Sequence, residues 1–260
     1  MDELSRETPH LPAETIRLPE RGFTIDRRKA LIAGALCWTG FAVIVWLVAN
    51  GGTEAFDRVG LLSGRSGTEL ALGGPALVRE IVRDITALGG VFLRNLFAIG
   101  AVVALLFLRL KREAVLFAMT VITGWLVNAA LKFAVGRERP QIVPHLMDAS
   151  GQSFPSGHSF NAALVYIAMA LAFAALSRRQ SVRYTVIGAA MLISAMVAWS
   201  RVMLGVHFPS DVIAGWLGGA GWAFMAAALL YRPAKAAAES DQLALPVRKA
   251  ARTSHRATRH

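Results

Sequence analysis

A twelve-residue stretch between two apolar runs carries side chains that could perform acid–base and nucleophilic chemistry. It extends from Ser200 to Asp211 and contains Arg201 and His207. Charged groups at the end of an apolar segment are costly unless paired, which makes them candidates for function. Pro209 suits the first turn of a helix, so Asp211 is expected within reach of His207. A carboxylate that holds one imidazole nitrogen leaves the other free as a nucleophile or base.

Two further polar motifs lie at the ends of other apolar runs. The first extends from Lys132 to Pro140 and includes Arg139. The second, Pro155-Ser156-Gly157-His158, precedes an apolar run. A Ser-Gly pair that opens a helix exposes backbone N–H groups and the positive end of the helix dipole, which together can bind an anion.

Each motif taken alone also has a simpler interpretation. Lys132 and Arg139 could be anchors that extend from a membrane helix to the headgroups. His158 could be a capping residue, and the Arg201 to Asp211 stretch could hold only an interfacial arginine and a capping aspartate.

Apolar residues make up 55% of the 260 residues and fall in long blocks. Each block is about long enough, with its flanks, to cross a bilayer as a helix. Five blocks contain no Asp, Glu, Lys or Arg, and a sixth carries Arg94 near one end: 30–49, 114–131, 159–176, 184–200 and 212–231, with 91–108 as the sixth. The expected fold class is therefore all-α, a polytopic membrane protein built as a six-transmembrane-helix bundle.

The basic excess predicts an orientation in the membrane rather than nucleic-acid binding. The chain has 28 Lys and Arg against 17 Asp and Glu, a net charge of +11. Most of the basic residues lie in four places that six spans would bring to one side: 1–29, 109–112, 178–183 and 232–260. The positive-inside rule makes that side cytoplasmic. Both termini are thus expected in the cytoplasm, and the active site is expected at the extracytoplasmic face of a bacterial inner (plasma) membrane.

The blocks also predict the domain organisation. A cytoplasmic tail, 1–29, precedes the membrane domain at 30–231, and a basic cytoplasmic tail follows at 232–260. An outer loop at 53–90 contains an amphipathic pattern bounded by Pro75 and Gly89, which predicts a helix lying at the interface. A lid or lipid guide beside the active site is the alternative role for this segment. Cys37 is the only cysteine, so no disulfide framework is expected.

The predicted topology brings all three polar motifs to one membrane face. Together they supply cationic side chains, backbone donors, two histidines and an aspartate. This set suits an anion of high charge density, because phosphoryl transfer requires positioning, stabilisation of the equatorial oxygens, and a nucleophile in line with a leaving-group acid. The residues alone do not determine which histidine attacks.

The three motifs resemble the signature of the type 2 phosphatidic acid phosphatase superfamily, which includes vanadium haloperoxidases and bacterial acid phosphatases. All three parts are complete and in the order of the family: Lys132-x6-Arg139-Pro140, Pro155-Ser156-Gly157-His158 and Ser200-Arg201-x5-His207-x3-Asp211. The motifs span residues 132–211, and the helix pattern extends the likeness to about 30–231.

The resemblance implies a role for each residue. His207 would be the nucleophile and form a phosphohistidine, Asp211 would orient it, and His158 would protonate the leaving group. The phosphate would be bound by cations and by donors at a helix start: Lys132, Arg139, Ser156, Gly157 and Arg201. No metal or other cofactor is implied.

The leading hypothesis is an integral-membrane phosphatase that acts on a lipid phosphate or diphosphate, such as undecaprenyl diphosphate or phosphatidate. A lipid phosphotransferase of the same superfamily is the alternative enzyme, and vanadate-dependent halide oxidation fits a membrane-embedded chain less well. A lipid transporter or non-catalytic scaffold is a further alternative, although a binding protein would not require a nucleophile, an acid and an orienting aspartate together. The expected partners are the lipid substrate and the bilayer, and the oligomeric state is left open.

Overall fold

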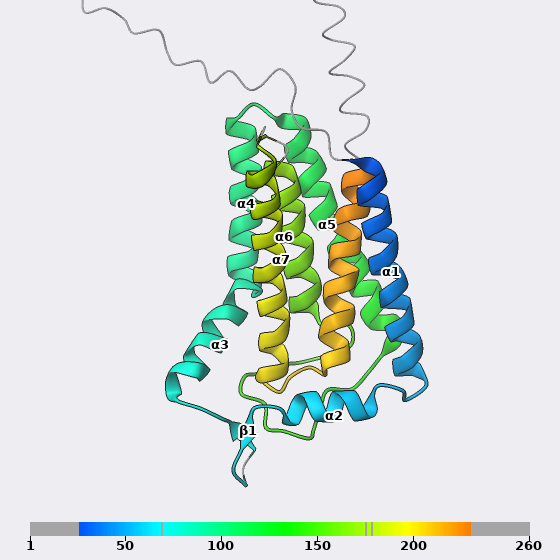
Figure 1. Ribbon diagram of the computed structural model, residues 1–260, viewed down its shortest axis with the longest axis vertical. Helices are drawn as coiled ribbons and strands as arrows, with labels where there is room; N and C mark the ends of the chain where they lie inside the picture. Colours follow the sequence, from blue (N-terminus) through cyan, green and yellow to red (C-terminus); the bar gives the residue numbers. More distant parts are fainter. Residues whose placement is uncertain (1–25, 69, 175, 178, 230–260) are drawn as a thin grey trace, which may run out of the picture.

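The computed structural model describes residues 26–229, apart from 69, 175 and 178. The two predicted tails thus lie almost wholly outside the described residues. The long helices stand roughly side by side in one bundle (Figure 1). Their bounds are α1 Arg27–Ala49, α2 Glu54–Leu62, α3 Ala76–Leu88, α4 Val91–Phe107, α5 Lys111–Val135, α6 Gly157–Ala174, α7 Gln180–Met203 and a final helix, Pro209–Leu229, called here the Pro209 helix. A short antiparallel hairpin, β1 Arg65–Ser66 and β2 Ala71–Leu72, follows α2, with Arg65 opposite Leu72.

The number of membrane spans agrees with the sequence. Five described helices are long and apolar enough to cross a bilayer, namely α1, α5, α6, α7 and the Pro209 helix. The sixth span arises if α3 and α4 are counted together, because they form a pair bent by 46° at the Gly89-Gly90 break. The expected amphipathic helix is α3, which begins after Pro75 and ends before Gly89.

Small residues allow α6 and the Pro209 helix to approach closely. Gly219 lies so near the Phe160 carbonyl that a Cβ there would clash with it, and a Cβ on Gly215 would lie 2.6 Å from the Ser156 carbonyl. Close backbone approach through small residues is a common way for membrane helices to associate. This contact places the first turns of both helices, which carry His158 and Asp211, next to each other.

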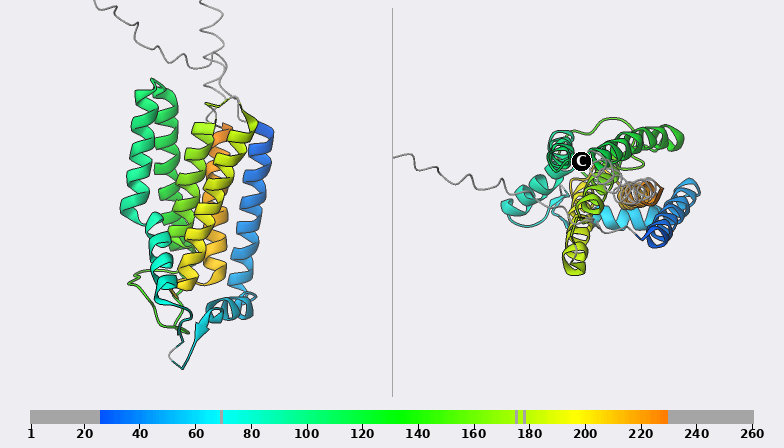
Figure 2. Two further views of the ribbon diagram at one scale, coloured as in Figure 1. Left: turned by 60° about the vertical axis from the view of Figure 1, so that its left-hand side comes forward. Right: turned by 90° about the horizontal axis from the view of Figure 1, so that it is seen from above.

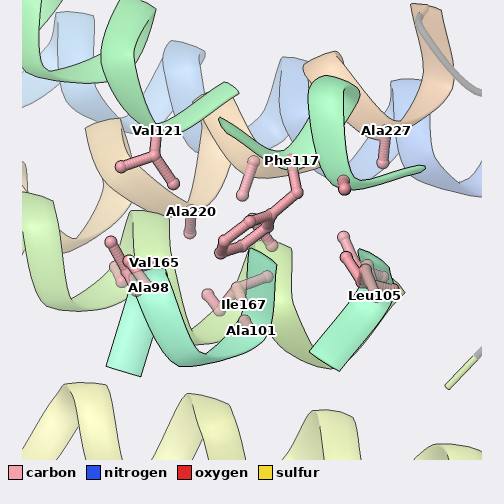
Figure 3. Close-up of a cluster of buried hydrophobic side chains, with 14 residues drawn as sticks. Ala98, Ala101, Leu105, Phe117, Val121, Val165, Ile167, Ala220 and Ala227 are labelled. Atoms are coloured by element: carbon pink, nitrogen blue, oxygen red, sulfur yellow. The ribbon is translucent and has the colours of Figure 1, made fainter. Parts of the chain in front are cut away.

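The largest apolar cluster lies in the half of the bundle away from these first turns. Phe117 of α5 projects into its centre and is only 2% exposed (Figure 3). Side chains of α4, α6 and the Pro209 helix surround it, among them Leu105, Ile167 and Ala220. Burial of an aromatic ring of this size is a large apolar contribution, so this cluster holds four spans together.

Both ends of the described chain lie at one end of the bundle, and the polar segments lie at the other. Figures 1 and 2 show the start of α1, the α4–α5 turn and the end of the Pro209 helix together at the top. Helix α2, the hairpin and the long loop that joins α5 to α6 gather at the bottom. This is the even-span arrangement that the sequence predicts.

The segment from Gly136 to Ser156 forms no helix or strand, yet polar contacts hold it against the bundle. The Ser153 amide donates to the Arg137 carbonyl, and the Leu146 amide donates to the Leu204 carbonyl. Long irregular segments in compact proteins are often functional. The second half of the first motif and the start of the second both lie in this loop.

Candidate active site

The structure places His207 between α7 and the Pro209 helix, where it is 2% exposed. Arg139 Nη1 lies 3.2 Å from His207 Nε2. A guanidinium can only donate, so Nε2 must be the accepting nitrogen and the ring proton must lie on Nδ1. Burial lowers the pKa of His207 to about 4, and the favourable interaction with Asp211 only partly offsets this effect. The ring is therefore neutral at neutral pH and has a lone pair on Nε2.

The Nδ1 side of His207 is connected to Asp211 through Ser153. Nδ1 lies 3.2 Å from Ser153 Oγ, which in turn donates a short hydrogen bond to Asp211 Oδ2. The direct distance from Nδ1 to Oδ2 is longer, 3.6 Å. With the proton on Nδ1, the chain of donors runs from His207 through Ser153 to Asp211. Asp211 lies close to His207, as predicted, but the Ser153 hydroxyl bridges the two side chains.

Sequence reasoning missed Ser153, Arg137 and Asp57. Arg137 Nη1 donates to Asp211 Oδ1 at 2.7 Å, and its Nη2 donates to Asp57 Oδ2 at 2.8 Å. Arg137 and Ser153 lie within or beside the motifs, so a search of motif neighbours could have found them. Asp57 lies about 80 residues before Arg137, in α2, and no local pattern points to it.

The three predicted cations reach the site from different elements. Arg139 also donates to the carbonyls of Val206 and Ser150, and Lys132 Nζ donates to the Gln152 carbonyl at 2.8 Å. Both side chains thereby brace the loop that carries the first two motifs. Lys132 is close enough to Arg139 and Asp211 to interact with their charges.

Arg201 is buried at the end of α7, at 2% exposure. Its Nη1 donates to Thr86 Oγ1 of α3 at 3.0 Å and contacts the sulfur of Met147, whereas Nε has no partner among the described residues. A buried unpaired N–H is costly, and this one is free to donate a hydrogen bond to an anionic oxygen. Helix α3 therefore contributes to the surroundings of the site through Thr86.

His158 lies in the first turn of α6, with its ring beside Gly89. It lies close enough to His207, Arg201 and Arg139 to interact with them electrostatically. Within the described part of the chain, its ring nitrogens make no hydrogen bond, so a ring nitrogen is available to a leaving group. The two histidines thus lie at the same site, as the motifs predict.

The anion-binding role expected for the Ser156 amide requires correction. This N–H donates to the Asp211 carbonyl at 3.1 Å, so it is already used to join α6 to the Pro209 helix. Ser156 Oγ accepts from Ser159 Oγ at 2.9 Å. Gly157 opens α6, and a Cβ there would lie 3.6 Å from Lys132 Cε. The helix start still faces a cation. Its Ser156 amide is already bonded, whereas the Ser156 hydroxyl only accepts in these bonds and keeps its own proton to donate.

The positive charge at the site comes from the side chains of Lys and Arg. Among the described residues, no three His, Cys, Asp or Glu side chains gather in a way that could hold a metal ion. A neutral imidazole, a second histidine and several fixed cations are suited to attack on a tetrahedral oxyanion such as a phosphoryl group.

Comparison with known proteins finds a family model and curated relatives that match this chain. A family model described as the PAP2 superfamily matches residues 112–235, which contain all three motifs. Phosphatidylglycerophosphatase B of Bacillus subtilis is 38% identical over 146 residues, which cover 53% of this chain and 68% of that protein. Lipid A 1-phosphatase of Rhizobium etli is 39% identical over 127 residues, 45% of this chain and 50% of that protein.

A solved structure also resembles the chain. The crystal structure of a transmembrane PAP2 type phosphatidylglycerolphosphate phosphatase from Bacillus subtilis aligns with a TM-score of 0.67 and 27% sequence identity. The alignment covers 74% of this chain and 93% of that chain. The likeness therefore extends beyond the motifs to most of the helix bundle.

Proposed function

Because this chain belongs to the PAP2 superfamily and is a membrane phosphatase of that family, we propose that it hydrolyses lipid phosphates or diphosphates through a phosphohistidine on His207. The observation that carries this proposal is the state of His207. Its ring is neutral, its proton is held on Nδ1 by Ser153 and Asp211, and its Nε2 meets a cationic side chain.

The proposed reaction has two steps. In the first, His207 Nε2 attacks phosphorus, the bond from phosphorus to the leaving oxygen breaks, and His158 gives that oxygen a proton. In the second, water attacks the phosphohistidine, the P–N bond breaks, and His158 takes the proton of the water. Arg139, now on Nε2, would move onto a phosphate oxygen as the bond forms. Lys132 and Arg201 would stabilise the charge that spreads over the equatorial oxygens.

A cavity of about 310 Å³ supports a substrate with a polar headgroup. It is lined by Leu72, Ala76, Arg79, Arg83, Leu146 and Leu204. Arg83 lies about one helical turn from Thr86, and Leu204 lies about one turn from Arg201. Two arginines in the lining of a cavity that also includes Leu204 suit an anionic headgroup better than a bare prenyl or acyl chain. Phosphatidylglycerophosphate therefore joins phosphatidate and undecaprenyl diphosphate as a candidate substrate.

We place this active site at the extracytoplasmic face of the bacterial inner membrane, on the strength of the Lys and Arg distribution. The arrangement of described helix ends, with α1 starting opposite the site, is compatible with two cytoplasmic termini.

The test is phosphate release by the purified protein in detergent micelles with EDTA present. The expected result is turnover of at least one lipid phosphate, and a phosphoenzyme that is stable in base but labile in acid. His207→Ala should abolish both. Added glycerol separates hydrolysis from phosphotransfer, because a phosphotransferase would form glycerol phosphate in place of free phosphate. Normal turnover by His207→Ala would show that another group is the nucleophile.

A further inference from the structure

A buried carboxylate outside the three motifs is joined to the site. Asp57 of α2 is 1% exposed. Its Oδ1 accepts from the Ser210 amide at 2.8 Å, and its Oδ2 accepts from Ser210 Oγ at 2.7 Å and from Arg137 Nη2 at 2.8 Å. These three short hydrogen bonds satisfy a buried carboxylate that touches no catalytic group directly.

The packing of α2 places Asp57 at the start of the Pro209 helix. Gly60 lies so close to Pro209 that a side chain there would clash with its ring, and Leu61 is buried in the cluster that includes Val202. Asp57 lies about one turn before both residues and so faces the same way. Its carboxylate satisfies a helix-terminal N–H that has no partner within its own helix. It also stands at the positive end of the helix dipole, where a negative charge is stabilised.

Arg137 is bonded to two carboxylates, those of Asp57 and Asp211. Its guanidinium also lies over the Phe208 ring, 4.1 Å from the centroid, and Nη1 donates to Ser210 Oγ. A planar fork held on three sides has little freedom to turn. The Asp211 oxygen that accepts from Arg137 is therefore fixed, which leaves the other oxygen aimed at Ser153.

We propose that Asp57 is a positioning residue for phosphoryl transfer, acting on Asp211 through Arg137 and Ser210. This inference rests on the proposed function and deepens it. The charges explain why a second acid is useful. A lone Arg137 beside Asp211 would draw on the negative charge that the ring of His207 needs when it becomes cationic in the phosphohistidine. Asp57 shares the positive charge of that guanidinium. Arg137 therefore neutralises less of the negative charge with which Asp211 interacts with Ser153 and His207.

The experiment compares Asp57→Asn with wild type on a soluble aryl phosphate and on a lipid phosphate. The amide has the same shape but offers N–H where Arg137 and Ser210 also donate. The expected result is a kcat lower by about 10- to 100-fold, the scale of one hydrogen bond to a charged group. KM should stay within about twofold, because Asp57 does not touch the substrate. Glu54→Gln is the matched control, since Glu54 lies in the same helix but is exposed.

A double variant tests the route of the effect. If Asp57 acts through Arg137, the loss in Asp57→Asn/Arg137→Gln should be close to that of the worse single variant and not the product of both. The inhibition constant of inorganic phosphate and the thermal unfolding midpoint in micelles report whether the site and the fold remain intact. If Asp57→Asn does not fold, Arg137→Lys decides instead, because it keeps the charge but loses the planar fork whose two nitrogens donate separately to Asp211 and Asp57.

The outcomes are distinct. A wild-type kcat in Asp57→Asn, or in Arg137→Lys where that variant decides, overturns the inference, as does a loss that comes with weaker phosphate inhibition and a raised KM. Multiplicative losses in the double variant would overturn the route through Arg137. Failure of the proposed function looks different, because wild type would then turn over the aryl phosphate but no lipid phosphate.

Discussion

The tautomer of His207 depends on single atoms of three residues: Arg139 and Ser153 from the loop before α6, and Asp211 from the Pro209 helix. Arg139 meets Nε2 and can only donate, while Ser153 Oγ lies at Nδ1 and donates its own hydrogen bond to Asp211. Any one of these contacts would orient the ring, but together they also determine which nitrogen holds the lone pair. A histidine is a useful nucleophile only in that state.

Ser153→Ala tests the serine in this chain of hydrogen bonds. Removing the hydroxyl leaves Nδ1 and Asp211 Oδ2 at 3.6 Å, too far for a good hydrogen bond. The expected loss in kcat is about 10- to 100-fold, from a hydrogen bond to a charged group of about 1.5–3 kcal/mol. Steady-state kinetics measure it, with Ser150→Ala as the control because only the Ser150 carbonyl bonds Arg139. Unchanged kcat would mean that Asp211 reaches His207 without the serine.

The pKa of His207 predicts the acid limb of the pH profile. Burial depresses it from 6.5 to about 4, so kcat/KM should stay high through pH 6 and fall only as the pH approaches about 4. The free energy of unfolding changes in the same direction as kcat/KM and falls as the pH falls. Between pH 6.5 and 4 the unfolded chain binds a proton that the folded chain does not, so this histidine makes the fold less stable as the pH falls through that window. A limb near pH 6.5 in kcat/KM would contradict the prediction.

His158 is expected to matter in proportion to how poorly the leaving group leaves. General acids typically contribute on the order of 10²–10⁴-fold. His158→Ala should therefore lose much activity on a lipid monophosphate and less on an aryl phosphate whose leaving group has a low pKa. Phosphoenzyme should still form on His207 with the activated substrate. Equal losses on both substrates would assign His158 to shaping the pocket and not to proton donation.

Among the elements, the pair formed by α6 and the Pro209 helix matters most to the site. Its first turns carry His158 and Asp211, and the Ser156 amide joins them through the Asp211 carbonyl. Lateral separation of these helices would move both histidine motifs at once. The close approach at Gly219 is what keeps them together.

Gly219→Ala tests this contact. The added methyl would collide with the Phe160 carbonyl, which is backbone and cannot rotate away. Overpacking of this kind costs about 1–3 kcal/mol, so the unfolding midpoint in micelles and kcat should both fall. Gly188→Ala in α7 is the control, because the added Cβ would meet no heavy atom within 4 Å outside the neighbouring backbone of its own helix. A Gly219→Ala variant as stable and active as that control would show that the helices can separate at no cost.

Element positions were largely predictable, and the contacts between them were not. The apolar blocks locate the spans, since a membrane helix must be long and apolar, and Pro75 and Gly89 bound α3 as expected. Helix α2 and its hairpin were missed inside the outer loop, because nine residues fall short of the about 11–18 residues over which a helical period is read from sequence. Thr86 of that loop accepts a hydrogen bond from Arg201, a contact that the alternative of an interfacial helix or a lid did not foresee.

At the scale of the site, residue types were predictable and bond partners were not. Motif order brought His158, His207 and Asp211 into one hypothesis, and the structure places them together. The backbone of Ser156 and the side chain of Asp57 depended on tertiary contacts across long sequence distances. The residues next to Ser156 and Asp57 in the sequence do not indicate these contacts, so local sequence patterns cannot predict them.

For the whole molecule, the orientation in the membrane is open to a direct test. In a Cys37→Ser background, Ala149→Cys lies in the loop at the site end, and Ser177→Cys lies between α6 and α7 at the opposite end. The positive-inside rule predicts that a membrane-impermeant thiol reagent labels the first in intact cells and the second only after lysis. The reverse pattern would invert the proposed topology.

The position of the nucleophile near the end of the described chain has a consequence for synthesis. His207 precedes the Pro209 helix, and Asp211 lies in its first turn, so a ribosome finishes the other described spans before it makes these residues. Each partly made chain would then be inert, even with the earlier described spans already inserted. Enzyme activity in a membrane would therefore count only molecules whose last described span has been inserted. Phosphate release could serve as an assay of completed insertion.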